Sequence, residues 1–252
     1  NVEGKAQTFT IDKAVSEANI EFKNGKDETI ELSKKESEPS QVKTSVKPIL
    51  AIKEHNFNPK DVVLHITSKD SKGNNGPAYE YSTALLTNAG SWTSDGDTHY
   101  YTLNNFTEDA NYSISMEYTD LAGNKVKTDT YYFTLDKTAP VGSLSVLENG
   151  VSVKYNDEKG SASFVHVSSN NVQISNEADD VTSGIDSVKY YLYHPSVDSK
   201  GSFNLPTKEE LESFEWLTWA GDLSLDSDQQ TIVYQRMEDK AGNVSYVNTS
   251  GA

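Results

Sequence analysis

A five-residue turn motif, D-x-A-G-N, occurs twice in this chain and constrains its fold more than any other feature. The two copies begin at Asp120 and Asp239, an offset of 239 − 120 = 119 residues. That spacing is far longer than the unit of a solenoid repeat, and it is close to the size of a whole domain. The repetition therefore predicts a chain that is built from consecutive, related domains.

The letters of the motif predict its local structure. Asp120 is suited to accept backbone N–H groups as the first residue of a type I turn. Ala122 tolerates the bridge region of backbone conformations, and Gly123 can adopt the positive φ of a bulge that closes a hairpin. We expect Asp239 and Gly242 to have the same roles in the second copy.

A strand pattern leads into the first copy. Every second residue before Asp120 is apolar, and this period of two is typical of a strand that is buried on one face. The apolar residues are Tyr112, Ile114, Met116 and Tyr118.

Tyr112 also predicts a second feature of β-sandwiches. It stands near the start of this strand, where a tyrosine corner places a Tyr whose hydroxyl bonds to upstream backbone. Thr231 holds the matching position in the second copy. We therefore expect a corner in the first domain and none in the second.

The strand after the motif indicates a further repeat. Residues 130–140 (TYYFTLDKTAP) end at Pro140, which cannot donate to a sheet ladder. Part of this stretch, FTLDK at 133–137, returns as FTIDK at 9–13. We interpret residues 1–13 as the trailing strand of a preceding repeat or a linker from it.

Size and composition fit two domains. The chain has 252 residues, of which 35% are hydrophobic and 10% aromatic, and this is enough for two cores of roughly 100 to 120 residues each. Pro140 stiffens the join between them. We expect the first domain at 14–137 and the second at 138–252.

Charge and cysteine content exclude several classes of function. The formal charge of −16 repels phosphate backbones and anionic lipids, so we expect no nucleic-acid partner, and it discourages association between copies, so we expect a monomer. Cysteine is absent, which excludes a disulfide framework and a thiol nucleophile. No stretch approaches the roughly 20 apolar residues of a membrane span.

Short β-branched and aromatic runs, separated by turn residues, recur through both domains, as in all-β sandwiches. Asn24-Gly25 predicts a two-residue hairpin turn between two early strands. In the second domain, the predicted strands include residues 162–167 (ASFVHV) and 171–175 (NVQIS).

One segment of the second domain breaks the β pattern. Thr207 and Glu210 form the two halves of a capping box, which predicts a helix of two or three turns. Leu211, Phe214 and Leu217 would share one face of it. In a sandwich we expect such a helix to cross between the sheets.

These motifs and runs resemble the bacterial immunoglobulin-like repeats that occur in tandem in large secreted and cell-wall proteins of Gram-positive bacteria, the Firmicutes especially. The resemblance covers nearly all of 14–252 and includes the segments SWTSDGDTHYYTL and IVYQRMEDKAGNVSYV. It implies two tandem immunoglobulin-like β-sandwiches in an extracellular protein, either secreted or attached to the cell wall. It supplies no catalytic residues.

The residues themselves favour no catalytic site. The histidines occur singly, outside any motif of a metalloprotease or hydrolase. They are His55, His65, His99, His166 and His194.

Residues 175–184 (SNEADDVTSG) are chemically suitable for a calcium site. Glu177, Asp179 and Asp180 stand among other oxygen-bearing side chains there, and Ca²⁺ prefers oxygen ligands. The spacing is not that of an EF-hand loop, so a solvated turn is the alternative.

Trp216 and Trp219 are the candidate ligand-binding residues. Exposed aromatic rings can stack on the C–H face of a sugar, whereas packing of the helix against a sheet would explain at least one of the two indoles.

From all this we expect a non-catalytic stalk, spacer or adhesion module that neighbours other repeats and contacts a host or plant glycan or a surface protein. The alternative is a carbohydrate-binding module or an accessory domain of a secreted carbohydrate-active enzyme.

Overall fold

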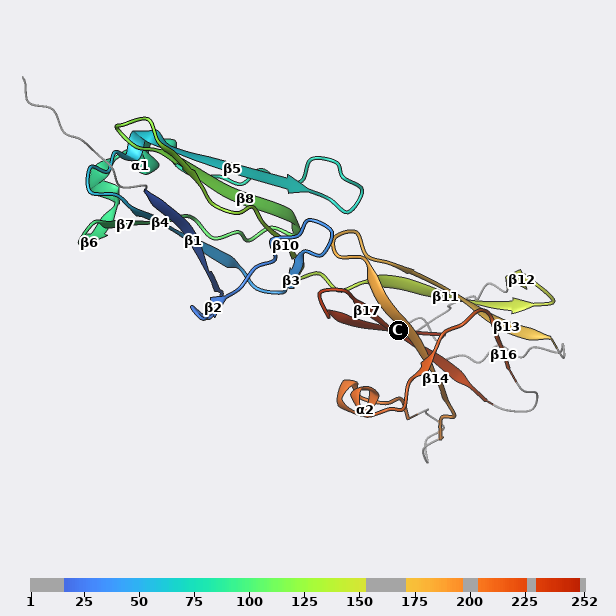
Figure 1. Cartoon of the computed structure of the whole chain (residues 1–252). Coiled ribbons are helices and arrows are strands. Elements are labelled where there is room, and N and C mark those ends of the chain that lie inside the picture. Colours follow the sequence, from blue (N-terminus) through green and yellow to red (C-terminus); the bar gives the residue numbers. More distant parts are fainter. Residues whose placement is uncertain (1–15, 153–170, 197–203, 226–229, 250–252) are drawn as a thin grey trace, which may run out of the picture. The chain divides into compact units, whose positions relative to one another are not determined.

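The chain divides into two compact units (Figure 1). The division falls between Leu135 and Asp136, close to the boundary expected from the sequence. The computed structural model describes residues 16–152, 171–196, 204–225 and 230–249. Residues 1–13, interpreted above as a trailing strand, lie outside the described residues.

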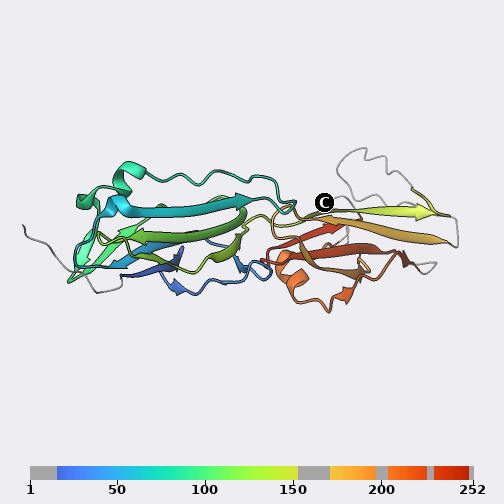
Figure 2. The same ribbon diagram turned by 45° about the horizontal axis from the view of Figure 1, so that its top comes forward.

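Strands dominate both units, and the predicted all-β sandwich fold is confirmed. In the first unit, one sheet has the strand order β2-β1-β4-β7-β6, and the other has the order β3-β10-β8-β5, with β9 also paired to β8 (Figure 2 shows β5 beside β8). The strands are β1 (Glu17–Asn24), β2 (Thr29–Ile30), β3 (Ser40–Val42), β4 (Val46–Lys53), β5 (Val62–Lys69), β6 (Thr93–Asp95), β7 (Thr98–Thr102), β8 (Ala110–Thr119), β9 (Lys125–Lys127) and β10 (Tyr131–Leu135).

The core of the first unit lies between these sheets and is rich in aromatic rings. The alternating apolar residues predicted before the first turn lie on the inner face of β8, and Ile114, Met116 and Tyr118 have no exposed surface. Phe106 packs edge-on against Phe133, with ring centroids 5.1 Å apart. The period of two therefore identified the buried face correctly.

Both D-x-A-G-N turns have the predicted form. The carboxylate of Asp120 accepts the backbone N–H groups of Ala122 (2.9 Å) and Asn124 (2.8 Å), and Gly123 has a φ of 88°. In the second copy Asp239 accepts the N–H of Asn243 at 2.8 Å, and Gly242 has a φ of 83°.

The tyrosine corner is present in the first unit. The Tyr112 hydroxyl donates to the backbone carbonyl of Glu108 at 2.9 Å. This hydrogen bond closes the bend just before β8 and connects that bend to β8 itself.

The hairpin between β1 and β2 differs from the prediction. Asn24 pairs with Glu28 through a backbone bond of 2.9 Å, so the loop contains three residues and not two. Positive φ falls on Asp27, at 62°, and not on Gly25. The Asn24 side chain explains this, because its Oδ1 accepts the N–H groups of both Lys26 and Glu28 and holds a wider loop.

Three short helical segments of the first unit were not predicted. The α-helix α1 (Thr83–Leu86) begins at Ser82, whose hydroxyl accepts the N–H of Leu85 at 3.2 Å. Two 3-10 turns, η1 (Pro59–Asp61) and η2 (Ala89–Ser91), begin with Asn side chains in the same capping role. Such short segments have no apolar period that would reveal them.

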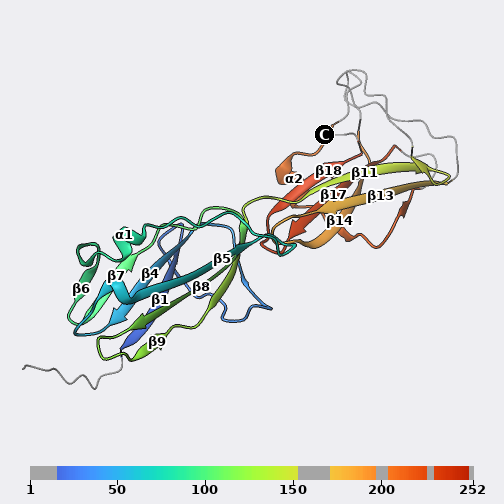
Figure 3. The same cartoon turned by 90° about the horizontal axis from the view of Figure 1, so that it is seen from above.

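The second unit repeats the two-sheet plan. One sheet has the order β12-β11-β13-β16 and the other β15-β14-β17-β18 (Figure 3 shows β11 beside β13). The predicted strand at 162–167 lies outside the described residues. The strands are β11 (Val141–Glu148), β12 (Val151–Ser152), β13 (Val172–Asp179), β14 (Ile185–Tyr193), β15 (Leu217–Thr218), β16 (Leu223–Ser224), β17 (Ile232–Asp239) and β18 (Val244–Asn248).

The capping box of the second unit is confirmed, and the helix α2 (Lys208–Glu212) follows it. The N–H of Glu210 donates to the Thr207 hydroxyl at 3.3 Å, while the Thr207 N–H donates to the Glu210 carboxylate at 2.8 Å. With five residues the helix is shorter than the predicted two or three turns. Leu217 belongs to β15 and is 56% exposed, so its assignment to a helical face was wrong.

The role predicted for this helix was also wrong. It connects β14 to β15, and both strands belong to one sheet, so it does not cross between sheets. Leu211 instead packs with Ile232 and Tyr234. These two residues flank Val233, which faces the inner core, so α2 covers the outer face of the β14–β17 sheet.

Candidate cation site in the second unit

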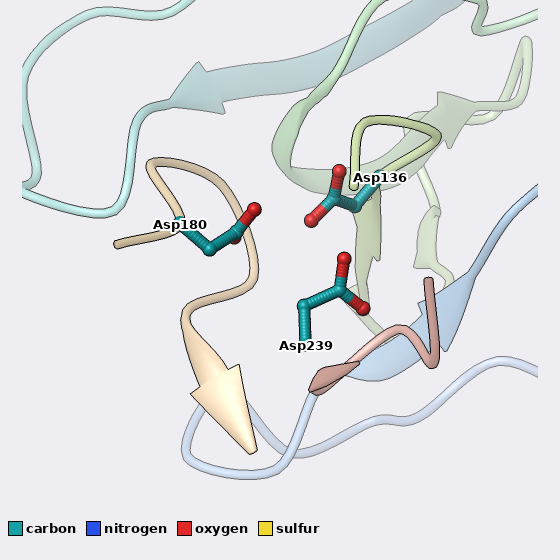
Figure 4. A group of neighbouring side chains, drawn as sticks. All are labelled: Asp136, Asp180 and Asp239. Carbon is teal, nitrogen blue, oxygen red and sulfur yellow. The ribbon is translucent and has the colours of Figure 1, made fainter. Parts of the chain in front are cut away.

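Three aspartates converge at one end of the second unit. Asp136 precedes β11, Asp180 directly follows β13, and Asp239 is the last residue of β17. One carboxylate oxygen from each lies within 4.8 Å of the others (Figure 4). Asp136 and Asp239 are almost fully buried, and Asp180 is partly buried.

Local hydrogen bonds fix the position of each carboxylate. Asp180 begins a tight turn in which its Oδ1 accepts the N–H groups of Ser183 (2.9 Å) and Gly184 (2.8 Å). Asp136 accepts the N–H of Thr138 at 3.0 Å with one oxygen and that of Ser183 at 3.0 Å with the other. Asp239 is held by its own turn, as described above.

The segment 136–140 is tied to the rest of the second unit. We call it the join segment, because it leads from β10 of the first unit to β11 of the second. The Asn243 side-chain amide donates to the backbone carbonyl of Asp136 at 3.1 Å. The Ser245 hydroxyl donates to the carbonyl of Pro140 at 2.5 Å. The repeated turn and the strand that follows it therefore hold both ends of the join segment.

The environment of Asp136 disfavours its negative charge. Burial raises the pKa of this carboxyl above its ordinary value, and the nearby charge of Asp180 acts in the same direction. Hydrogen bonds from Ser183 and Thr138 oppose part of this increase in pKa. Either a proton or a cation bound among the three carboxylates would relieve the repulsion, and hard cations such as Ca²⁺ take oxygen ligands of this kind.

Of the three calcium ligands predicted from the sequence, one belongs to this cluster of aspartates. Asp180 belongs to it, whereas Glu177 and Asp179 are both exposed on β13. Residues two apart in a strand share a face, so Glu177 and Asp179 point outward together. The Oε2 of Glu177 accepts the Ser143 hydroxyl at 3.4 Å instead. The grouping of all three as one site was therefore wrong.

Two members of the cluster were visible in the sequence, though not as acids of one site. Asp239 was noted as the first residue of the repeated turn, and Asp136 as part of the repeated FTLDK stretch. The recurrence of each residue was the available signal. It predicts a turn at Asp239 and a trailing strand around Asp136, but not a shared site, because the sequence does not reveal which segments lie at the same end of a sandwich.

The first unit places acids at two of the same three positions. β1 pairs with β4 from Glu17 opposite Lys53, as β11 pairs with β13 from Val141 opposite Asp179. The residue after β4, Glu54, therefore corresponds to Asp180. Glu54 is 4% exposed and accepts the Ser16 hydroxyl at 2.7 Å.

Asp120 corresponds to Asp239 in the same comparison and is also 4% exposed. The third position, that of Asp136, falls at Asp12, which lies outside the described residues. Within the described part of the first unit, two of the three acidic positions are thus repeated.

The two candidate ligand-binding tryptophans do not form one surface. They flank the short strand β15 at an odd spacing, so they lie on opposite faces of the sheet. Trp219 joins the inner core, where its ring lies 5.6 Å from that of Tyr190. Trp216 joins the outer cluster under α2, 5.6 Å from Tyr246, and its indole N–H donates to the Leu211 carbonyl at 2.9 Å. A platform made from both indoles is therefore not present.

Comparison with protein-family models and with curated proteins gives no match to this chain. Among the described residues, no helix has both the length and the apolar character needed to cross a membrane.

Proposed function

We propose that this chain is a non-catalytic pair of immunoglobulin-like modules from a secreted or cell-wall-attached bacterial protein, and that it acts as a spacer or adhesion module. The hydrogen-bonded join segment is the observation that carries the proposal. A chain that must hold successive modules in a limited range of orientations needs a short join that is fixed to at least one of them.

The join segment has the properties that this role requires. It contains only residues 136–140 between β10 and β11, and it includes no glycine. Asp136 is held in one position, because its side chain is buried and accepts hydrogen bonds from two backbone N–H groups. Flexible linkers are instead rich in Gly and Ser and make no such contacts.

The net negative charge supports a spacer role, because it disfavours association between copies of the chain. The formal charge of −16 produces mutual repulsion between molecules at neutral pH. Two separately packed sandwiches also give each module its own core, so that shape is retained along the array.

Spin labels provide a direct test, because the chain has no cysteine of its own. Nitroxides would be attached to Val63→Cys in β5 and Leu217→Cys in β15, two exposed positions in different units. Double electron–electron resonance should give a narrow distribution of distances. A six-residue Gly/Ser insertion after Leu135 should broaden it.

The matched control is the same insertion between Lys72 and Gly73, in an exposed loop of the first unit. It should leave the distribution unchanged. If the unmodified chain already gives a distribution as broad as that of the Leu135 insertion, the join is free and the spacer proposal is wrong.

A glycan-binding role is the second candidate, and one observation favours it. Trp216, Tyr246 and Tyr191 form a partly exposed aromatic cluster on the outer face of the β14–β17 sheet. Aromatic faces of this kind can stack on sugar rings. A glycan array should then show binding that is lost in Trp216→Ala and kept in Tyr132→Ala, a partly exposed tyrosine of the first unit. Absence of binding by the unmodified chain would remove this candidate.

A further inference from the structure

The repeated turn allows the inner faces of the two units to be compared residue by residue. β8 and β17 lead into Asp120 and Asp239, so residues at equal distances before these aspartates correspond. Met116 and Gln235 are such a pair, and neither has any exposed surface. The first unit thus buries a thioether where the second unit buries an amide of nearly the same size.

The amide of Gln235 is only half satisfied. Its Nε2 donates to the backbone carbonyl of Glu177 at 3.1 Å. Its Oε1 is fully buried and has no hydrogen-bond partner in the described part of the chain. A buried acceptor that has lost water and gained no partner destabilises the folded state.

A second buried polar atom of the second unit is in the same condition. The indole N–H of Trp219 is buried and has no partner among the described residues. In the first unit, the buried Trp92 donates its indole N–H to the Leu86 carbonyl at 2.8 Å. Both tryptophans pack in the inter-sheet core of their unit. The difference is that the indole N–H has a hydrogen-bond acceptor in the first unit and has none among the described residues in the second.

A third difference between the units also leaves the second unit with fewer stabilising contacts. Tyr112 bonds to Glu108 and stacks on Phe133 at 5.2 Å, whereas its counterpart in the second unit is Thr231. At each of these three positions the second unit therefore has either a buried polar group without a partner, as at Gln235 and Trp219, or no counterpart of a stabilising contact, as at Thr231.

We propose that the second unit is the one that unfolds first when the chain is stretched or destabilised, and that Gln235 is a main determinant of this order. The inference rests on the proposed spacer function, in which a unit that yields early would lengthen the array and spare the first unit. It concerns the order of unfolding, which can be measured whether or not the join is rigid.

Hydrogen exchange on the full chain tests the order without any substitution. Amide exchange would be followed by NMR or mass spectrometry across a series of denaturant concentrations, in the presence of EDTA. Amides of β17 should lose protection at lower denaturant than those of β8. Loss of protection in β8 first, or in both strands together, would overturn the proposal.

The matched substitutions test the determinant. Gln235→Met introduces the residue of the first unit and should raise the thermal midpoint of the second unit by roughly 4 °C. Gln230→Met, at an exposed glutamine of the same unit, is the control and should leave that midpoint unchanged. Met116→Gln should lower the midpoint of the first unit.

An unchanged or lower midpoint in Gln235→Met would refute the role of this residue. The spin-label experiment addresses the join segment alone. A broad distance distribution would therefore reject the spacer function without bearing on the order of unfolding, and the reverse also holds.

Discussion

The two units share a framework but place their aromatic rings in different layers. In the first unit Phe106, Tyr112 and Phe133 lie between the sheets, with centroids no more than 5.2 Å apart. In the second unit Phe214 and Trp216 lie outside the sheet sandwich, under α2. The eight-residue pairing of β1 with β4 is nevertheless matched by that of β11 with β13, and the repeated turn is the same.

This difference separates two kinds of constraint. The turn needs an Asp to accept backbone N–H groups and a Gly for positive φ, and few substitutions meet both requirements. A core needs only apolar volume, which many combinations of side chains supply. The turns have therefore stayed alike while the cores have diverged.

The largest expected effect comes from removing a ring of the first core. Phe133→Ala should lower the free energy of unfolding of the first unit by about 3–5 kcal/mol, because the ring is fully buried. Phe214→Ala, in the partly exposed outer cluster of the second unit, should have a clearly smaller effect. Urea denaturation of both variants checks the pair, and equal losses would show that the outer cluster is as important as the inner core.

The next effect is an opposite response of the two units to pH. Hydrogen bonds from Asn124, the largest cause, hold the pKa of Asp120 below its ordinary value of 3.8. Asp120 therefore stabilises the first unit above that value, and this stabilisation is lost as pH falls through its lowered pKa.

The pKa of Asp136 is instead raised from 3.8, mainly by burial. Its contribution to the second unit is fully present below pH 3.8 and is lost as pH rises through the raised pKa. Thermal midpoints measured against pH should show this loss in the unmodified chain, without added cations, and not in Asp136→Asn. An identical pH profile for the two proteins would contradict the assignment to Asp136.

The smallest effect concerns the tyrosine corner. Tyr112→Phe removes only the hydroxyl that donates to Glu108 and should destabilise the first unit by about 1 kcal/mol. Tyr132→Phe, at a partly exposed tyrosine of the neighbouring strand, is the control. A loss in Tyr112→Phe no greater than in the control would mean that the corner adds nothing to stability.

Local chemistry made much of the fold predictable. The turns at Asp120 and Asp239, the tyrosine corner at Tyr112 and the capping box at Thr207 each depend on a few neighbouring residues. The structure contains all of them. The prediction failed where a side chain made additional hydrogen bonds. The Asn24 side chain accepts two backbone N–H groups and thereby stabilises a wider loop than the two-residue turn expected at Asn24-Gly25.

The candidate cation site could not be predicted as a whole. Asp136, Asp180 and Asp239 are far apart in the sequence and meet only because the start of β11 and the ends of β13 and β17 lie at the same side of the second unit. The same limit applies to Trp216 and Trp219. Their closeness in sequence suggested one surface, whereas the intervening strand sends them to opposite faces.

The position of Asp136 has a practical consequence for anyone who expresses the second sandwich alone. Its side chain accepts a hydrogen bond from Ser183 and its backbone carbonyl accepts one from Asn243, both in turns of that unit, although the sequence pattern puts it in the tail of the preceding strand. A truncated gene that starts at residue 138 would discard this contact. A recombinant fragment should therefore start at or before Asp136 if it is to fold as it does in the longer chain.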